Sequence, residues 1–474
     1  PCFYCIASSI GSSADFCRTE YRVFGQLSGS ICILASSLDP LDATPYIALR
    51  LAKPIRLSPR FLYWAGGEKM YQLMITATPW RECFRALTRA AVLCAMVFLA
   101  VPTEAAQDAQ MAEVESDFNP NFPRTMSWSA YNLGTTGYNQ AVGIGKALKD
   151  NYGVNLRVLP GKNDVSRLLP LQRGRVQFSA NGVATYFGQE GVFQFAGKTW
   201  GPMPLRIVLA SHGDSNQALG VANDLGIKTY ADLRGKRVPF VRGAPALNVT
   251  TEAFLACGGL TWEDVERVDF PGYNAMWTGV VNGQVDAAYA TTVSGPTRKL
   301  EASPRGIFWP PAPHGDVGCW ERMAEVVPFM QKHMATRGAA ISADNPHEGA
   351  TYPYPILIAL ADQDAQIVHD LAKAIHLHYD EYKNADPGSI GWAMDRQNFQ
   401  WVVPYHDGSV RYLKSIGVWS DEAEAHNRRL IERQAVLAAA WREQKAANPE
   451  DFVDAWMQRR AEALVAAGFE PIWR

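Results

Sequence analysis

The sequence predicts a protein of two α/β lobes, and three observations support this expectation. The chain has 474 residues, more than one compact core usually contains, so two or more lobes are expected. Between residues 126 and 290, short apolar segments alternate with amphipathic ones, an order typical of mostly parallel sheets covered by helices. Each half of this region also has a polar, glycine-containing turn that leads into a helical segment.

The first lobe is expected to begin with a strand, followed by alternating helices and strands. The ranges are 126–133 (strand), 140–151 (helix), 156–159 (strand), 164–173 (helix), 176–180 (strand) and 205–211 (strand). The polar sequence SHGDSNQ, residues 211–217, is turn-prone and indicates a hinge or a crossover to a second lobe.

The second lobe repeats the alternation. We expect strands at 218–222, 238–241, 265–270 and 285–290, a helical turn at 229–237, and helices at 250–257 and 273–282. From Tyr352 the run YPYPILIALA predicts a strand that returns to the first lobe. A helix follows at 363–384, and residues 421–468 are mostly helical, charged and interrupted at Asn448-Pro449.

The N-terminal part has the pattern of a secretory signal peptide. The apolar run of residues 90–101 follows three arginines and precedes small residues, so cleavage is expected near Ala105 or Ala106. A membrane span needs about twenty apolar residues, more than this run contains. A buried core helix is the alternative. Residues 1–69 show no sustained helical or strand period and are expected to be a non-native or disordered upstream segment.

These patterns divide the chain into six parts. They are the upstream segment 1–69, the signal peptide 70–106, the first part of lobe I at 107–214, lobe II at 215–350, a return to lobe I with a hinge helix at 351–420, and a helical C-terminal extension at 421–474. Periplasmic localisation is therefore expected.

Composition and motifs exclude several classes of function. The net charge is −2 and there is no basic run, so nucleic acid is not an expected partner. Beyond the signal peptide only Cys257 and Cys319 remain; they could pair, but the sequence does not show that they meet. No zinc-binding spacing, nucleophile elbow or phosphate-loop motif occurs, so we expect no metal, no cofactor and no enzymatic activity.

Polar residues at the strand–helix turns indicate a site for a small anion. Helix starts offer free N–H groups, and hydroxyl and amide side chains can add hydrogen bonds. A tight turn without a ligand would explain each loop equally well. The candidate ligand-binding residues are Thr135, Thr136, Tyr138, Lys162, Asn163 and Asn181 in the first lobe, and Arg242, Gly243, Ala246, Asn248, Thr291 and Thr292 in the second.

Five segments together resemble a known family. They are LGTTGYNQAVG, PGKNDVSRLLPLQRGRVQFS, DLRGKRVPFVRGAP, VVNGQVDAAYAT and ATYPYP. They resemble the solute receptors of tripartite ATP-independent periplasmic (TRAP) transporters, of the TAXI subfamily. The resemblance implies a type II periplasmic-binding-protein fold, with two α/β lobes joined by hinge strands around a ligand cleft.

The resemblance also implies a function and partners. The expected protein is a monomeric extracytoplasmic receptor that delivers a small anionic metabolite, a carboxylate or an amino acid, to a membrane-embedded TRAP permease. The family's ligands include glutamate and 2-oxoglutarate. Here PGK (160–162) replaces the usual GGS and ALN (246–248) replaces GSG, so ligand identity is not carried over. An exported enzyme or a sensory module on the same scaffold is the alternative.

Overall fold

The computed structural model describes residues 118–473 and, before them, the five short strands at residues 31–34, 48–51, 62–66, 69–73 and 75–76. The chain divides into two compact units, Pro1–Ser116 and Asp117–Arg474. In the first unit the strands are β1 (Ile31–Leu34), β2 (Ala48–Leu51), β3 (Leu62–Gly66), β4 (Lys69–Leu73) and β5 (Ile75–Thr76).

The strands of the first unit form a three-stranded sheet, in the order β1-β2-β5, and a two-stranded sheet of β3 and β4. β1 pairs antiparallel with β2, β2 pairs parallel with β5, and β3 pairs antiparallel with β4. Segments of two to five residues are too short for alternation to reveal them in the sequence. The apolar run expected to be a signal peptide, residues 90–101, lies outside the described residues.

Lobe I is built on a five-stranded sheet in the order β7-β6-β8-β17-β9. β6 pairs parallel with β7 and β8, whereas β17 pairs antiparallel with β8 and β9. The strands are β6 (Thr125–Ala130), β7 (Asn155–Pro160), β8 (Phe178–Asn181), β9 (Leu205–Ala210) and β17 (Ile356–Leu360), with helices α4 (Thr136–Tyr152), α5 (Asp164–Gln172) and α6 (Ala184–Glu190). Lobe I is therefore completed by a strand that follows lobe II in the chain.

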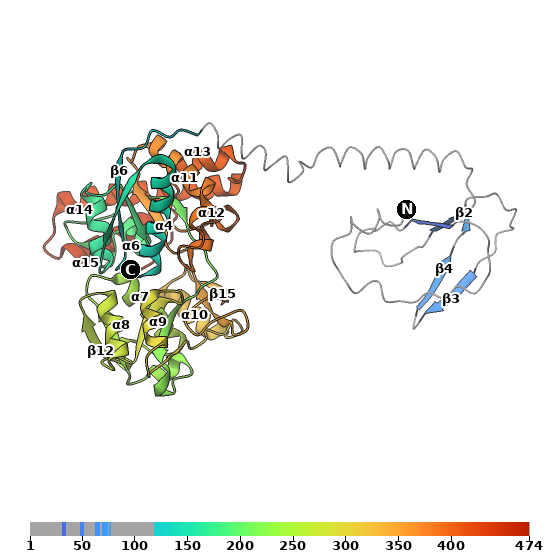
Figure 1. The fold of residues 1–474 in the computed structure, drawn as a ribbon, viewed down its shortest axis with the longest axis horizontal. Helices are drawn as coiled ribbons and strands as arrows, with labels where there is room; N and C mark the ends of the chain where they lie inside the picture. Colours follow the sequence, from blue (N-terminus) through green and yellow to red (C-terminus); the bar gives the residue numbers. More distant parts are fainter. Residues whose placement is uncertain are drawn as a thin grey trace. The chain divides into compact units, whose positions relative to one another are not determined.

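Lobe II has a sheet in the order β13-β10-β16-β15, with β14 also on β10, and a parallel pair of β11 and β12. Its strands are β10 (Gln217–Ala222), β11 (Arg237–Val241), β12 (Glu266–Phe270), β13 (Ala287–Thr291), β14 (Ile307–Phe308), β15 (Gln331–Ala335) and β16 (His347–Thr351). Its helices are α7 (Pro245–Cys257), α8 (Tyr273–Val281), α9 (Gly295–Glu301) and α10 (Val317–Val326). Figure 1 shows this lobe in light green, yellow and light orange, below lobe I in this view.

Two segments carry the chain between the lobes. Residues 211–216 lead from β9 to β10, and residues 352–355 lead from β16 back to β17. The segments are hydrogen-bonded to each other, because the Ser211 N–H donates to the Pro355 carbonyl at 2.8 Å and the Tyr354 N–H donates to the Ser211 carbonyl at 2.6 Å. The predicted two-lobed α/β fold with C-terminal helices is confirmed.

The C-terminal helices pack on lobe I. They are α11 (Ala365–Leu377), α12 (Tyr379–Tyr382), α13 (Asp407–Ser415), α14 (Asp421–Ala447) and α15 (Phe452–Ala466) (Figure 1). Glu190 at the end of α6 is fully buried and pairs with Arg433 of α14 and Arg460 of α15. These ion pairs fasten the helical extension to the body of lobe I.

Several helix boundaries differ from the sequence expectation. The helix expected from residue 140 begins at Thr136, and the one expected from residue 250 begins at Pro245, so the polar turn residues belong to the first helical turns. The helix expected at 363–384 is two helices that meet at His378. The short elements α10, β15, β16 and α13 were not expected, because a few alternating residues give a weak pattern.

Cys257 and Cys319 form a disulfide that joins the end of α7 to α10, with 4.0 Å between their Cα atoms. The bond closes a loop with a sequence separation of 62 residues. Replacing both cysteines with Ser is expected to lower the free energy of unfolding by about 4 kcal/mol, since loop closure in the unfolded chain is lost. Urea unfolding measures this loss; equal midpoints for the variant and the wild type would contradict it.

Candidate functional site

A small cavity lies between the two lobes and beside the crossing segment 352–354. The centre of a water-sized sphere can move over about 30 Å³ within it. Lobe I contributes the ends of β6 and β8 and the start of α5, and lobe II contributes β10, β13 and the starts of α7 and α8. The lining residues are Tyr131, Thr135, Asp164, Arg167, Gly182, Val183, Gln217, Ala246, Leu247, Tyr273, Tyr289, Ala290, Thr291, Ser294, Tyr352 and Tyr354.

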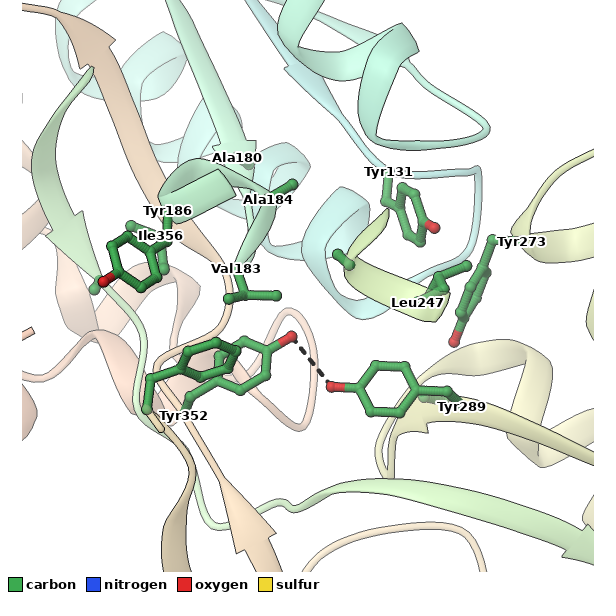
Figure 2. Packing of buried hydrophobic residues seen from close by; sticks show 14 of the residues in the cluster. Tyr131, Ala180, Val183, Ala184, Tyr186, Leu247, Tyr273, Tyr289, Tyr352 and Ile356 are labelled. Carbon is green, nitrogen blue, oxygen red and sulfur yellow. Dashed lines mark hydrogen bonds between the residues drawn. The ribbon is translucent and has the colours of Figure 1, made fainter. Parts of the chain in front are cut away.

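Five tyrosines dominate the lining, and four of them are labelled in Figure 2. The hydroxyls of Tyr289 and Tyr352 lie 3.2 Å apart (Figure 2). The Tyr289 hydroxyl also donates to Gln217 Oε1 at 3.0 Å. Tyr273 donates to Ser294 Oγ at 2.9 Å. Burial raises the pKa of all five phenols, so they remain neutral hydrogen-bonding groups at neutral pH.

The cavity holds one buried ion pair, Asp164 with Arg167, in the first turn of α5. Asn163 caps this helix and accepts from the Ser166 N–H at 2.9 Å. Asp164 and Arg167 share a helix face with Leu168 and Leu171, so the face that packs inward also carries both charges. Their side chains are 0% and 3% exposed, and Arg167 Nη2 donates to Asp164 Oδ1 at 2.6 Å.

Asp164 also connects the lobes, because its Oδ2 accepts from the Ala246 N–H at the start of α7, at 2.7 Å. Both carboxylate oxygens therefore have a donor. Burial lowers the pKa of Arg167, but Asp164 and the nearby tyrosines raise it by more, so the guanidinium stays charged.

Some hydrogen-bond donors of the Arg167 guanidinium have no acceptor among the described residues. Its Nε and Nη1 atoms are buried and form no hydrogen bond of normal geometry with a described residue, and neither does the hydroxyl of Tyr131; the hydroxyl of Tyr354 interacts with the guanidinium. The guanidinium lies over the Tyr131 ring, 4.2 Å from its centroid. Buried polar groups in native proteins almost always have partners. Unpaired N–H groups on a cation indicate that the cavity takes an acceptor, most favourably an anion.

The lobes contact each other directly around the cavity. Asn163 Nδ2 donates to the Arg242 carbonyl at 2.9 Å, and the Val165 N–H donates to the Gly243 carbonyl at 3.1 Å. The Tyr273 N–H donates to the Lys162 carbonyl at 3.1 Å. These bonds join the start of α5 to the loops that precede α7 and α8, which makes this a closed arrangement of the two lobes.

Three of the twelve residues predicted for the site line the cavity: Thr135, Ala246 and Thr291. Thr135 Oγ1 donates to the Asn132 carbonyl at 2.7 Å. Thr291 Oγ1 lies 3.3 Å from Ser215 Oγ. Ala246 contributes its backbone N–H to Asp164.

Four other predicted residues lie where the lobes meet but do not line the cavity. Asn163 is the helix cap, and Gly243, with a φ of 72°, turns the chain tightly beside it. The side chains of Lys162 and Arg242 are exposed, and both residues use their backbone carbonyls to join the lobes. Neither cation enters the cavity.

The remaining predicted residues have structural contacts. Thr136 donates to Asp386, a residue 250 positions later in the chain. Asn248 binds both the N–H and the carbonyl of Val241, and thereby closes the loop before α7. Tyr138, Asn181 and Thr292 do not line the cavity either; Asn181 accepts from the Gly182 N–H, and Thr292 donates to the Arg337 carbonyl.

The ion pair and the tyrosines were not predicted from the sequence. One signal could have revealed the ion pair: Asp164, Arg167, Leu168 and Leu171 follow the i, i+3, i+4, i+7 pattern, so two charges fall on the apolar face of a short helix. The tyrosines come from separate segments at residues 131, 273, 289, 352 and 354, and no local pattern links them.

Closure of the lobes depends on a close approach between two glycines. A Cβ atom built on Gly295, at the start of α9, would lie 2.2 Å from the carbonyl oxygen of Gly134 in lobe I. Gly295→Ala should therefore prevent this closed arrangement and weaken solute binding by about tenfold or more, a loss of about 1.4 kcal/mol. Calorimetric titration beside thermal unfolding measures both properties; unchanged affinity would contradict the prediction.

Comparisons with known proteins gave a partial family match and similarities to solved structures. A family model described as NMT1/THI5 like matches residues 151–326. The chain is similar to a solved structure from Bordetella bronchiseptica RB50, with 17% identity, coverage of 66% of this chain and 98% of that one, and a TM-score of 0.37. The comparison with curated proteins gave no match.

Two further solved structures resemble the chain. The periplasmic aliphatic sulphonate binding protein SsuA of Escherichia coli has 13% identity, coverage of 72% and 92%, and a TM-score of 0.35. PhnD1 of Prochlorococcus marinus, in complex with methylphosphonate, has 13% identity, coverage of 57% and 92%, and a TM-score of 0.37. At these values the similarities carry no argument about the ligand of this chain.

The residues that the structure describes contain neither a metal-binding group nor a membrane-spanning helix. No group of three or more His, Cys, Asp or Glu side chains there is arranged to hold a metal ion. No helix in the same part of the chain has the length and apolar character that crossing a membrane requires.

Proposed function

We propose that the protein is an extracytoplasmic receptor that binds a small anionic solute between its two lobes and delivers it to a membrane transporter. One observation carries the proposal: a buried arginine with two unpaired nitrogen atoms, Arg167, lines a cavity formed by both lobes. A solute that pairs with Arg167 of lobe I can also contact lobe II, and so favours the closed arrangement.

Three features support export and binding. The apolar run at 90–101 with its flanking residues has the pattern of a signal peptide. The Cys257–Cys319 disulfide is typical of proteins in oxidising compartments. The match to an NMT1/THI5-like family model over residues 151–326 agrees with solute binding.

The geometry assigns roles within the site. Arg167 would bind the anionic group, and Asp164 would hold Arg167 in position through its bond to the Ala246 N–H. Thr135 and Thr291 would contact the solute from opposite lobes. Each hydrogen bond between Arg167 and an anion contributes about 1.5–3 kcal/mol, so two such bonds and several neutral ones are compatible with micromolar binding after the cost of closure.

The class of transporter is a separate part of the proposal. The sequence resemblance favours a TRAP permease of the TAXI subfamily, whereas the similar structures include substrate-binding proteins of amino acid ABC transporters. Uptake of a labelled solute by cells distinguishes the two. If the ion gradients are collapsed while ATP is preserved, TRAP-dependent uptake stops. If ATP is depleted while the gradients are preserved, ABC-dependent uptake stops.

A thermal-unfolding screen tests the binding function itself. A ligand that binds only the folded state at a hundred times its Kd stabilises the protein by about 2.7 kcal/mol, which raises Tm by several degrees. We expect stabilisation by carboxylates or other small oxoanions and none by matched neutral amides. No stabilisation by any anion at millimolar concentration would refute the proposal.

A further inference from the structure

We propose that the solute is a short-chain monocarboxylate with a second oxygen on the neighbouring carbon, that is, a small 2-oxo or 2-hydroxy acid. This inference rests on the proposed function and specifies the solute class of the same site. It follows from the charge, the size and the unpaired donors of the cavity.

Charge favours a single negative group. Arg167 and Asp164 are the charged residues in the lining, and together they are neutral. A monocarboxylate therefore leaves one net negative charge in a buried site, whereas a dicarboxylate leaves two. Lys162 and Arg242 do not compensate the second charge, because their side chains point to solvent. Buried uncompensated charge is strongly unfavourable, which selects against dicarboxylates.

The same lining disfavours α-amino acids. An α-ammonium group needs a carboxylate or several carbonyl acceptors when it is buried. Asp164 is the acidic residue in the lining, and its two oxygens already accept from Arg167 and from the Ala246 N–H. The other polar groups are mainly the hydroxyls of tyrosine, threonine and serine. These hydroxyls both donate and accept, so the lining has no unpaired carboxylate for an ammonium group, whereas Arg167 has unpaired donors for an anion.

Size points to a short chain. The space that the centre of a water-sized sphere can reach in this cavity is about 30 Å³, so the closed arrangement leaves little free room beside the lining. A solute of a few non-hydrogen atoms fits the closed arrangement with small shifts of the lining. A five-carbon dicarboxylate would have to hold the lobes apart.

The unpaired hydroxyl of Tyr131 indicates that the solute has a second oxygen, on the carbon next to its carboxylate. The side chain of Tyr131 is 4% exposed, its hydroxyl has no partner among the described residues, and its ring lies directly under the Arg167 guanidinium. Arg167 and Tyr131 thus present two chemically different unpaired donors on one side of the cavity. A carboxylate satisfies the guanidinium, and an oxygen on the adjacent carbon is placed to accept from the phenol.

Calorimetric titration of the protein with six probes tests this inference: pyruvate, lactate, propionate, succinate, 2-oxoglutarate and glutamate. We expect pyruvate or lactate to bind at least tenfold more tightly than propionate, which lacks the second oxygen, and more tightly than the three larger solutes. Tyr131→Phe should weaken pyruvate and lactate binding by about five- to tenfold and leave propionate binding unchanged, since one hydrogen bond is lost.

Tyr131→Phe removes a hydroxyl that has no partner, so the variant should fold as the wild type does. Arg173→Gln, at an exposed arginine just after α5, is the matched control and should change no affinity. Tighter binding of glutamate, 2-oxoglutarate or succinate than of pyruvate and lactate would overturn the inference and leave the proposed function standing. So would an equal effect of Tyr131→Phe on propionate. Absence of binding by every probe and every other small anion would instead refute the proposed function.

Discussion

Replacing Arg167 with Gln is expected to weaken solute binding by about 100- to 10 000-fold. The variant loses two charge-assisted hydrogen bonds to the anion, each worth about 1.5–3 kcal/mol, and every 1.4 kcal/mol is a factor of ten in Kd. Calorimetric titration with the tightest solute of the screen measures the loss. Arg173→Gln, which changes an exposed arginine of the same lobe, should bind as the wild type does.

The Arg167 variant also leaves Asp164 buried without its cation, so folding must be measured separately. Arg167→Lys and the double variant Asp164→Asn with Arg167→Gln address this point. The lysine variant keeps the charge but lacks the planar donor set of a guanidinium, so we expect a smaller loss of affinity. The double variant removes both charges and should fold without binding. Wild-type affinity in a folded Arg167→Gln protein would place the anion elsewhere.

Glu190→Gln should lower the free energy of unfolding by about 3–5 kcal/mol, because it leaves two buried arginines without a counter-charge. Arg433 donates to Glu190 at 2.7 and 2.8 Å, and Arg460 pairs with the same carboxylate. Both arginines also donate to carbonyls of the C-terminal tail, at Glu470, Ile472 and Trp473. Neutralising Glu190 should therefore weaken the packing of α14, α15 and the C-terminal tail together.

Urea unfolding measures this effect, and limited proteolysis shows whether the C-terminal helices detach first. Glu443→Gln is the matched control, since Glu443 is 68% exposed and pairs with Arg459 at 3.2 Å on the surface. Surface ion pairs contribute about 0–1 kcal/mol, so this variant should be close to wild type. Equal stability losses in the two variants would contradict the account of the extension.

The pH dependence of stability should include Glu190. Burial raises the pKa of this carboxyl, but the hydrogen bonds and charges of Arg433 and Arg460 lower it by more. The pKa of Glu190 therefore lies below its ordinary value of 4.5. A depressed pKa in the folded state adds stability above pH 4.5, and this contribution is lost as the pH falls through the folded value. The difference in free energy of unfolding between wild type and Glu190→Gln, measured by urea unfolding, should therefore narrow as the pH falls from 4.5 toward the folded pKa of Glu190; a difference independent of pH would contradict this prediction.

The fold was largely predictable because its signal is local and repeated. Alternating apolar and amphipathic segments predicted the order of strands and helices in both lobes, and the apolar run after Tyr352 predicted a strand that returns to lobe I, now seen as β17. The break between α14 and α15 was visible at Asn448, which adopts a φ of 39° at the helix end. Short elements such as β15 and β16 gave too few alternating residues.

The candidate site was less predictable because its contacts join distant segments. Thr136 was predicted to bind the ligand, but it donates to Asp386, which no local pattern indicates. Arg242 and Lys162 looked like anion-binding cations, but their side chains are exposed. Arg167 was not among the predicted site residues, because it lines the cavity together with five tyrosines that come from separate segments.

Native mass spectrometry of the exported protein, purified without added ligand, tests the central claim most directly. The account predicts a small anionic molecule bound in a one-to-one ratio in the wild type and in Arg173→Gln, and its absence from folded Arg167→Gln. A bound molecule retained by folded Arg167→Gln would contradict the claim that Arg167 holds the solute. So would a wild-type protein that carries no ligand and gains none when small monocarboxylates are supplied.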